Sequence, residues 1–127
     1  MRVFLTKAMA RFVRQEEICE STLHKAIVRA EHGRIDADLG NGLIKQRVAR
    51  PGKGKSGGYR TLIAYRRGDR AIFLFGFAKS EKENIDAQEL CGVRELANYW
   101  LKAGAGHIEE ALANHTIREV PSYDQTT

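Results

Sequence analysis

Residues 71–78 constrain the fold more than any other stretch, because four large apolar residues, from Ile72 to Phe75, follow one another there. Side chains alternate between the two faces of a strand, so such a run is apolar on both faces and indicates a strand in the middle of a sheet. Residues 59–67, rich in Thr, Ile and Tyr, precede it, and the Gly68-Asp69 turn joins the two segments into a hairpin.

Other segments also have the pattern of strands. Residues 43–49 alternate, so that one side carries the cations Lys45 and Arg47 and the other side is apolar. Residues 35–39 are a shorter candidate, separated from them by a glycine-rich turn. Because short turns join these strands, we expect an antiparallel meander. Residues 1–5 leave two alternatives open, an opening strand or the lead-in to a helix.

Two helical patterns precede the strands. In residues 7–17 the apolar side chains recur every third or fourth position and form one stripe, and Thr6 can cap the N-terminus. The next segment repeats this arrangement, with Ser21 as a possible cap and Gly33 where a helix often ends in a left-handed glycine. The sequence therefore predicts a helical hairpin with one apolar side, which needs a flat apolar surface to cover.

A third helix follows the strands. Asp86 and Glu89 have the spacing of a capping box, and an apolar stripe runs from there to Gly104. Residues 106–115 are a candidate for a short fourth helix, and residues 121–127 are polar and expected to fray. The predicted fold class is α+β, with an N-terminal helical hairpin packed on a small antiparallel sheet, followed by one C-terminal helix and a short tail.

The charge of the chain is concentrated in one region. Residues 45–82 contain eleven Lys and Arg against two acidic residues, Asp69 and Glu81, a balance of +9 in a chain whose net charge is +5. Such segregation onto a glycine-rich loop and its flanking strands is typical of a site for a polyanion, most often nucleic acid. The alternative is a solvated basic face that keeps the protein soluble.

Length and composition narrow the class of protein. The 127 residues suffice for one domain with a core of its own, and 43% apolar with 29% charged residues is typical of globular proteins. We find no apolar run long enough for a membrane span or a secretory leader, so we expect a cytoplasmic protein.

Cys19 and Cys91 are far apart in sequence, and we expect two reduced, partly buried thiols. The histidines show no metal-ligand spacing, so neither a metal nor a cofactor is expected.

The segment Gly54-Lys55-Ser56 invites comparison with a phosphate-binding P-loop. That motif needs a glycine five positions before Gly54, where this chain has Ala49, and it runs into a helix rather than a strand. These departures from the motif argue against a nucleotide triphosphatase. The basic loop also has no Ser-His-acid set or carboxylate pair beside it, so acid–base chemistry there would depend on cations and tyrosine.

Four stretches together resemble the RelE-like toxins of bacterial toxin–antitoxin modules. They are Ala37-Asp38-Leu39-Gly40, Ile44-Lys45-Gln46-Arg47-Val48-Ala49-Arg50-Pro51-Gly52, Gly54-Lys55-Ser56-Gly57-Gly58-Tyr59-Arg60, and Gly76-Phe77-Ala78-Lys79-Ser80-Glu81-Lys82-Glu83-Asn84-Ile85. The resemblance implies a two-helix hairpin on a small twisted antiparallel sheet. It also implies an mRNA endonuclease that enters the ribosomal A site and is held inactive by a cognate antitoxin. Residues 1–104 would form the toxin domain and residues 105–127 a C-terminal extension.

RNA cleavage by its own 2′-hydroxyl needs a base, an acid for the leaving 5′-oxygen, and positive charge around the phosphorane. A lysine among other cations has a lowered pKa, so Lys53 and Lys55 are our candidates for the base and for phosphate contact. Arg60, planar and permanently charged, suits the phosphorane. The remaining candidates are Lys79 and Lys82 to close the site, Arg47 and Arg50 to hold the flanking backbone, and Tyr59 and Phe77 to stack on a base.

These assignments have alternatives. Phe77 continues the apolar face of a buried strand, so core packing is favoured over stacking, and Tyr59 is evenly balanced. Arg66, Arg67 and Arg70 surround a turn and are interpreted as solubilising charges. A non-enzymatic toxin that blocks a protein such as DNA gyrase, or a basic nucleic-acid-binding module, are alternative functions. In either toxin class we expect a cognate antitoxin that is also a DNA-binding repressor, and that lays an acidic or amphipathic helix on the basic groove or the helical hairpin.

Overall fold

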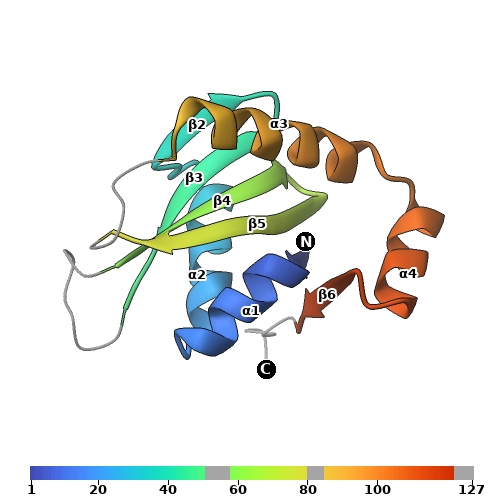
Figure 1. Cartoon of the computed structure of the whole chain (residues 1–127), viewed down its shortest axis with the longest axis horizontal. Helices are drawn as coiled ribbons and strands as arrows, with labels where there is room; N and C mark the ends of the chain where they lie inside the picture. The colour runs from blue at the N-terminus through green and yellow to red at the C-terminus, as the bar shows by residue number, and fades with distance from the viewer. Residues whose placement is uncertain (51–57, 80–84, 122–127) are drawn as a thin grey trace.

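The computed structural model describes residues 1–50, 58–79 and 85–121, and Figure 1 shows how their helices and strands are arranged. The chain opens with a strand, continues through two helices and four strands, and closes with two helices and a strand. The elements are β1 (Arg2–Thr6), α1 (Lys7–Gln15), α2 (Glu20–Glu31), β2 (Ala37–Gly40), β3 (Leu43–Val48), β4 (Tyr59–Arg66), β5 (Arg70–Ala78), α3 (Ala87–Lys102), α4 (Ala105–Ala113) and β6 (Ile117–Val120). The predicted α+β class is confirmed.

The described strands form one mixed sheet in the order β2-β3-β4-β5-β1-β6. Strands β2 to β5 are the expected antiparallel meander, and β5 lies in the interior of the sheet as its sequence predicts. The expectation of a purely antiparallel sheet is wrong, because β1 pairs parallel with β5, with Phe4 opposite Ile72. The N-terminal hairpin is likewise preceded by a strand, since residues 2–6 belong to the sheet rather than to the lead-in of a helix.

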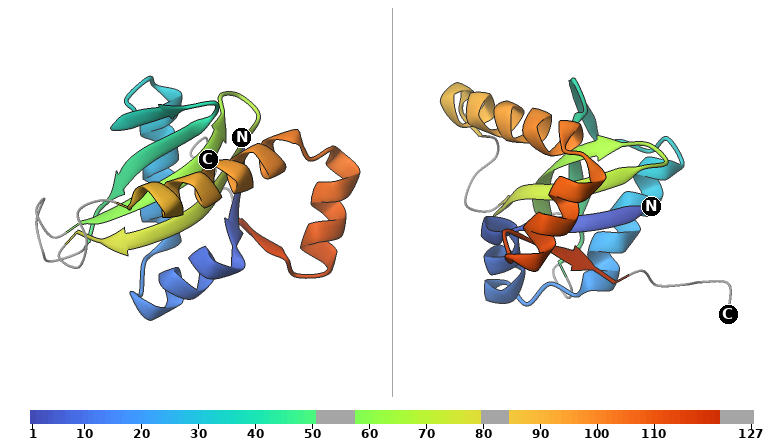
Figure 2. Two further views of the ribbon diagram at one scale, coloured as in Figure 1. Left: turned by 45° about the horizontal axis from the view of Figure 1, so that its top comes forward. Right: turned by 90° about the vertical axis from the view of Figure 1, so that its right-hand side faces the viewer.

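Helices α1 and α2 cover one face of the sheet (Figure 2). Thr6 caps α1 as predicted, because its Oγ1 accepts a hydrogen bond of 3.1 Å from the Met9 amide. The N-cap of α2 is Cys19 rather than Ser21, and Gly33 follows the helix with a φ of 80°, as its expected position requires. Both cysteines are exposed, so the expectation of partly buried thiols is wrong.

Helices α3 and α4 cover the opposite face, which explains why β5 is apolar on both sides. Asp86 and Glu89 form the predicted capping box of α3. The buried side chains of this helix lie in its second half, and Trp100 belongs there to one apolar cluster with Phe4 and Ile72. None of the described helices is long and apolar enough to cross a membrane.

The C-terminal part of the chain completes the sheet. Strand β6, which no sequence pattern predicted, pairs antiparallel with β1 and occupies an edge. Arg2 joins β1 to α4 and β6 by ion pairs, because its guanidinium lies 2.9 Å from both Glu109 of α4 and Glu119 of β6. The expected boundary at residue 104 falls between α3 and α4, and Ile108 of α4 belongs to the same apolar cluster as Trp100.

Candidate nucleic-acid interface

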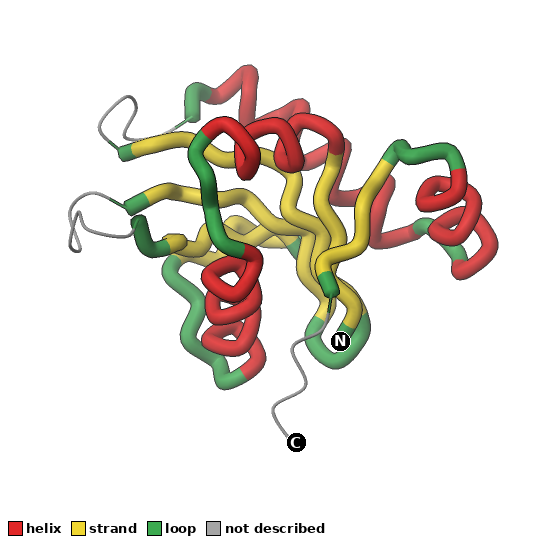
Figure 3. Tube along the Cα trace, turned by 90° about the horizontal axis from the view of Figure 1, so that it is seen from below, coloured by secondary structure: helices red, strands yellow, loops and turns green. Residues whose placement is uncertain are grey.

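The candidate residues gather where β3 ends, β4 begins and β5 ends, at one end of the sheet (Figures 1 and 3). Arg47 lies opposite Arg60, and Arg60 lies opposite Phe77. Directly opposed residues of neighbouring strands have side chains on the same face. Leu62, two residues after Arg60 on β4, packs in the cluster of α3, so these side chains share the face that α3 covers. The register therefore brings two arginines that are distant in sequence side by side.

Arg60 is half-buried, and its Nη1 atom is buried and has no hydrogen-bond partner among the residues that the structure describes. Nearly all buried polar atoms of proteins have a partner, so an unsatisfied guanidinium N–H is unusual. Such a group gains free energy when an anion reaches it, because a charge-assisted hydrogen bond then replaces an unmet one. The chemistry of this position fits a phosphate oxygen.

The neighbouring cations have different surroundings. Arg47 is exposed, its amide donates to Asp36 at 2.7 Å, and its Nε lies 3.8 Å from the same carboxylate. The guanidinium of Arg50 lies 5.6 Å from the centroid of the Tyr59 ring. Lys79 is exposed directly after β5, and its amide nitrogen lies 3.4 Å from the Gly58 carbonyl oxygen. Four cations thus surround one end of the sheet, and Asp36 neutralises part of the charge of one of them.

The two aromatic candidates are packed inside. Tyr59 is 2% exposed, its hydroxyl donates to Glu16 at 3.0 Å, and its ring meets Phe12 edge-on at 5.3 Å between centroids. Burial, and secondarily the hydrogen bond to Glu16, raise the pKa of the Tyr59 hydroxyl. Phe77 is 6% exposed beside Phe75. This packing favours the core alternative for both rings over stacking on a base.

Three candidates, Lys53, Lys55 and Lys82, lie outside the described residues. In sequence, Lys53 and Lys55 lie between β3 and β4, and Lys82 lies between β5 and α3. Among the residues that the structure does describe, no three His, Cys, Asp or Glu side chains gather as metal ligands would.

The arginines of the β4–β5 turn have a structural role that the sequence interpretation missed. Arg66 donates to the carbonyl of Leu101, and Arg70 donates to the carbonyls of Trp100 and Ala103 at 3.1 and 2.7 Å. These are carbonyls at the C-terminus of α3, which lack partners within the helix. Arg66 and Arg70 are therefore caps for α3 rather than merely solubilising charges.

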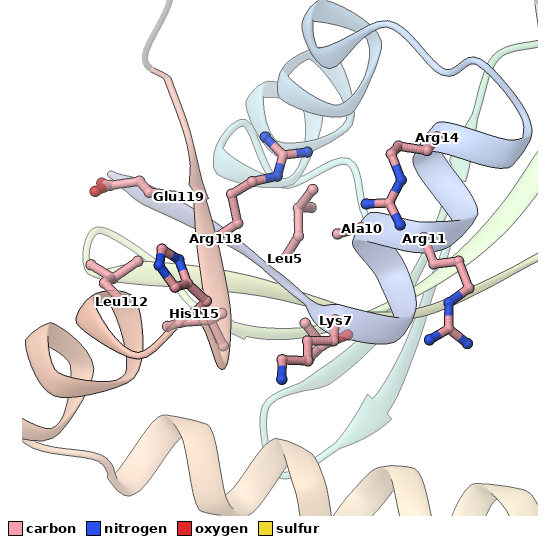
Figure 4. A pocket seen from close by; sticks show the side chains of 11 residues that line it. Leu5, Lys7, Ala10, Arg11, Arg14, Leu112, His115, Arg118 and Glu119 are labelled. Atoms are coloured by element: carbon pink, nitrogen blue, oxygen red, sulfur yellow. The ribbon is translucent and has the colours of Figure 1, made fainter.

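The sequence analysis also missed a second group of cations, on α1 and β6. Lys7, Arg11 and Arg14 of α1 and Arg118 of β6 line a pocket between these two elements (Figure 4). Their spacing of four and three residues on α1 would have placed the first three on one helix face. The sequence offered no sign that a C-terminal strand would lie beside that face.

The fold and its basic end define a small α+β protein with a surface suited to polyanions. The family model described as RelE toxin of RelE / RelB toxin-antitoxin system matches residues 1–120, and the chain belongs to that family. It is accordingly the toxin of a toxin–antitoxin pair, with a cognate antitoxin as partner. The match extends through α4 and β6. Comparison with curated proteins gave no match.

Proposed function

We propose that this toxin is a ribosome-dependent mRNA endonuclease that acts in the cytoplasm and inhibits translation by cutting messages in the ribosomal A site. The observation that carries the proposal is the gathering of Arg47, Arg50, Arg60 and Lys79 at the end of the sheet from which the glycine- and lysine-rich segments depart. A phosphodiester backbone requires positive charge on the surface that binds it.

The reaction is a transfer within the RNA. The 2′-oxygen loses its proton to a base, attacks the adjacent phosphorus, and the bond from phosphorus to the 5′-oxygen breaks as that oxygen takes a proton. The products are a 2′,3′-cyclic phosphate and a free 5′-hydroxyl. Negative charge on the non-bridging oxygens rises in the transition state, so fixed cations accelerate the step.

Arg60 would bind a non-bridging phosphate oxygen, because its buried Nη1 is a donor without a partner in the described part of the chain. Arg47 and Arg50 would hold the backbone on either side, and Lys79 would close the site with Lys82. Lys53 or Lys55 would remove the proton of the 2′-hydroxyl. Tyr59 would support the site by its packing rather than by touching RNA.

The cation density supports cleavage more than a non-enzymatic block of a protein target. A protein-blocking surface needs complementarity to a folded partner, whereas four cations at one end of a sheet suit an anionic chain. We further propose that the antitoxin is a DNA-binding repressor of the pair's own operon.

The test expresses the wild-type chain, the Lys55→Ala/Arg60→Ala double variant and the control Arg67→Ala in a bacterial host. Arg67 is exposed at the β4–β5 turn, away from the strand ends that carry the candidates. We expect wild type and control to arrest growth and to create new 5′ ends inside translated codons, and the double variant to do neither. Arrest without message cleavage would place the protein in the blocking class, and the absence of arrest by wild type would contradict the proposal altogether.

A further inference from the structure

Strand β6 is an edge of the sheet that the described residues form. It is the last strand in the sheet order and pairs only with β1 among the described strands, with Leu5 opposite Arg118. An edge strand presents a row of backbone N–H and C=O groups that a further strand can bind. A peptide that adds in this way obtains affinity from main-chain hydrogen bonds and specificity from alternate side chains.

A pocket of about 410 Å³ lies between this edge and helix α1 (Figure 4). Leu5, Ala10 and Ile117 form its floor and are themselves buried in the core, and half-buried Leu112 closes one side. An apolar floor beside an open strand edge is suited to an apolar side chain carried on an extended backbone.

The rim of the pocket is cationic. Lys7, Arg11 and Arg14 of α1 line the pocket together with Arg118 of β6, and none of the three α1 cations has an ion pair with a described residue. Glu119 is the one carboxylate among the lining residues.

The carboxylate of Glu119 and the guanidinium of Arg118 are both already paired with other residues. Both oxygens of Glu119 accept hydrogen bonds of 2.9 Å from Arg2, and this pairing lowers the pKa of Glu119. Arg118 is paired with Glu20 at 2.5 Å, whereas the α1 cations have no such partner within residues 1–50, 58–79 and 85–121. The pocket therefore has an excess of positive charge that an acidic ligand would complement.

The strand edge, the apolar floor and the cationic rim together distinguish between two classes of ligand. A nucleic-acid backbone would use the cations but would leave the strand edge and the apolar floor without partners. An extended peptide with alternating acidic and apolar side chains would use all three, since alternate side chains point to opposite faces. The observations favour the peptide.

We propose that the groove between β6 and α1 is the docking site for an acidic, extended segment of a protein partner, which adds to β6 as a seventh strand. One apolar side chain of that segment enters the pocket, and its carboxylates pair with Lys7, Arg11 and Arg14. The identity of the partner as the antitoxin rests on the toxin function, whereas the site itself does not.

Helix α1 links this groove to the candidate nucleic-acid interface. The face that bears Ala10 and Arg11 lines the pocket, and Phe12 of the same helix packs against Tyr59 at the start of β4. A ligand in the groove thus contacts a helix that packs against the first residue of β4, without occupying the interface itself.

The test uses the full chain, labelled with ¹⁵N, and a short synthetic peptide of alternating glutamate and valine. We expect amide shifts concentrated in β6 and α1, and an affinity at least about tenfold weaker for the Lys7→Glu/Arg11→Glu variant. Glutamate suits the first turns of a helix, so this variant should fold. Arg67→Glu, a matched charge reversal at the β4–β5 turn, should bind as wild type does.

Two further probes separate the alternatives. The same peptide with alternate backbone nitrogens methylated should bind much more weakly, because it cannot complete the strand pairing. A single-stranded RNA oligonucleotide should not shift the β6 amides. No binding of the acidic peptide, equal binding of the methylated one, or RNA shifts at β6 would each overturn the proposal. None of these measurements needs RNA cleavage, so failure of the endonuclease proposal would be seen separately.

Discussion

The substitution Gly76→Ala tests how α1 is seated on the sheet. A Cβ atom built at Gly76 would lie 2.8 Å from two ring carbons of Phe12 and 3.2 Å from the sulfur of Met9. Met9 is fully buried, and Phe12 is half-buried and packs edge-on against Tyr59. The new methyl group must therefore displace a packed aromatic ring.

The sign of the effect distinguishes this packing argument from backbone propensity. Replacing glycine in a strand interior would by itself stabilise the fold by about 0.5–1 kcal/mol. Overpacking of this kind costs about 1–3 kcal/mol. We expect a net loss of about 1–2 kcal/mol in the free energy of unfolding, which corresponds to a fall of roughly 3–10 °C in Tm for a chain of this size.

Urea denaturation followed by circular dichroism measures this change, with the midpoint expected to fall and the slope m to stay constant. Gly92→Ala is the matched control, because a Cβ at this exposed position of α3 meets nothing within 4 Å and should stabilise by up to about 1 kcal/mol. In a Phe12→Leu background, Gly76→Ala should cost at least about 1 kcal/mol less. A neutral or stabilising effect of Gly76→Ala in the wild-type background would refute the reasoning.

Three further predictions concern stability. Arg70→Ala removes the donors to the carbonyls at the end of α3 and should destabilise by about 1.5–3 kcal/mol, while thermal unfolding of Arg67→Ala should match wild type within about 0.5 kcal/mol. Asp86→Ala breaks the capping box and should cost about 1 kcal/mol, with Asp86→Asn recovering most of it in urea titrations. Burial, then the hydrogen bond to Glu31, raise the pKa of Tyr65, so the stability tied to its neutral form is complete below the pKa of free tyrosine and is lost as the pH rises toward the folded value. Tyr65→Phe should flatten this alkaline decline, and an unchanged pH profile would contradict the assignment.

Local signals accounted for the parts of the fold that the sequence predicted well. The caps at Thr6 and Asp86 were predictable because each depends on residues within one helical turn. The interior position of β5 followed from its two apolar faces. Such features involve short sequence separations and need no knowledge of distant partners.

Pairings between distant segments were not predictable in the same way. Strand β1 lies parallel to β5, and β6 pairs with β1 across more than a hundred residues of chain, so no local pattern specifies either partner. The capping of α3 by Arg70 could not be predicted for the same reason. Arginines around a turn give the same sequence pattern whether they are solvated or bound to a helix end.

The candidate site was predicted in part. The alternation of residues 43–49 placed Arg47 on the polar side of its strand, and the register then brought Arg60 beside it, which only the tertiary pairing determines. For Tyr59 the sequence left stacking and packing evenly balanced, because aromatic side chains serve both purposes and burial depends on α1. The basic groove beside β6 required a strand that the sequence did not indicate.

The most direct test of the central claim measures cleavage of a defined message on purified ribosomes by the wild-type toxin, Arg60→Ala and Arg60→Lys. We expect Arg60→Ala to cut at least about a hundredfold more slowly, Arg60→Lys to retain part of the rate, and a message with a 2′-deoxynucleotide before the scissile phosphate to remain uncut. Cleavage of the 2′-deoxy message, or full activity of Arg60→Ala, would contradict the account.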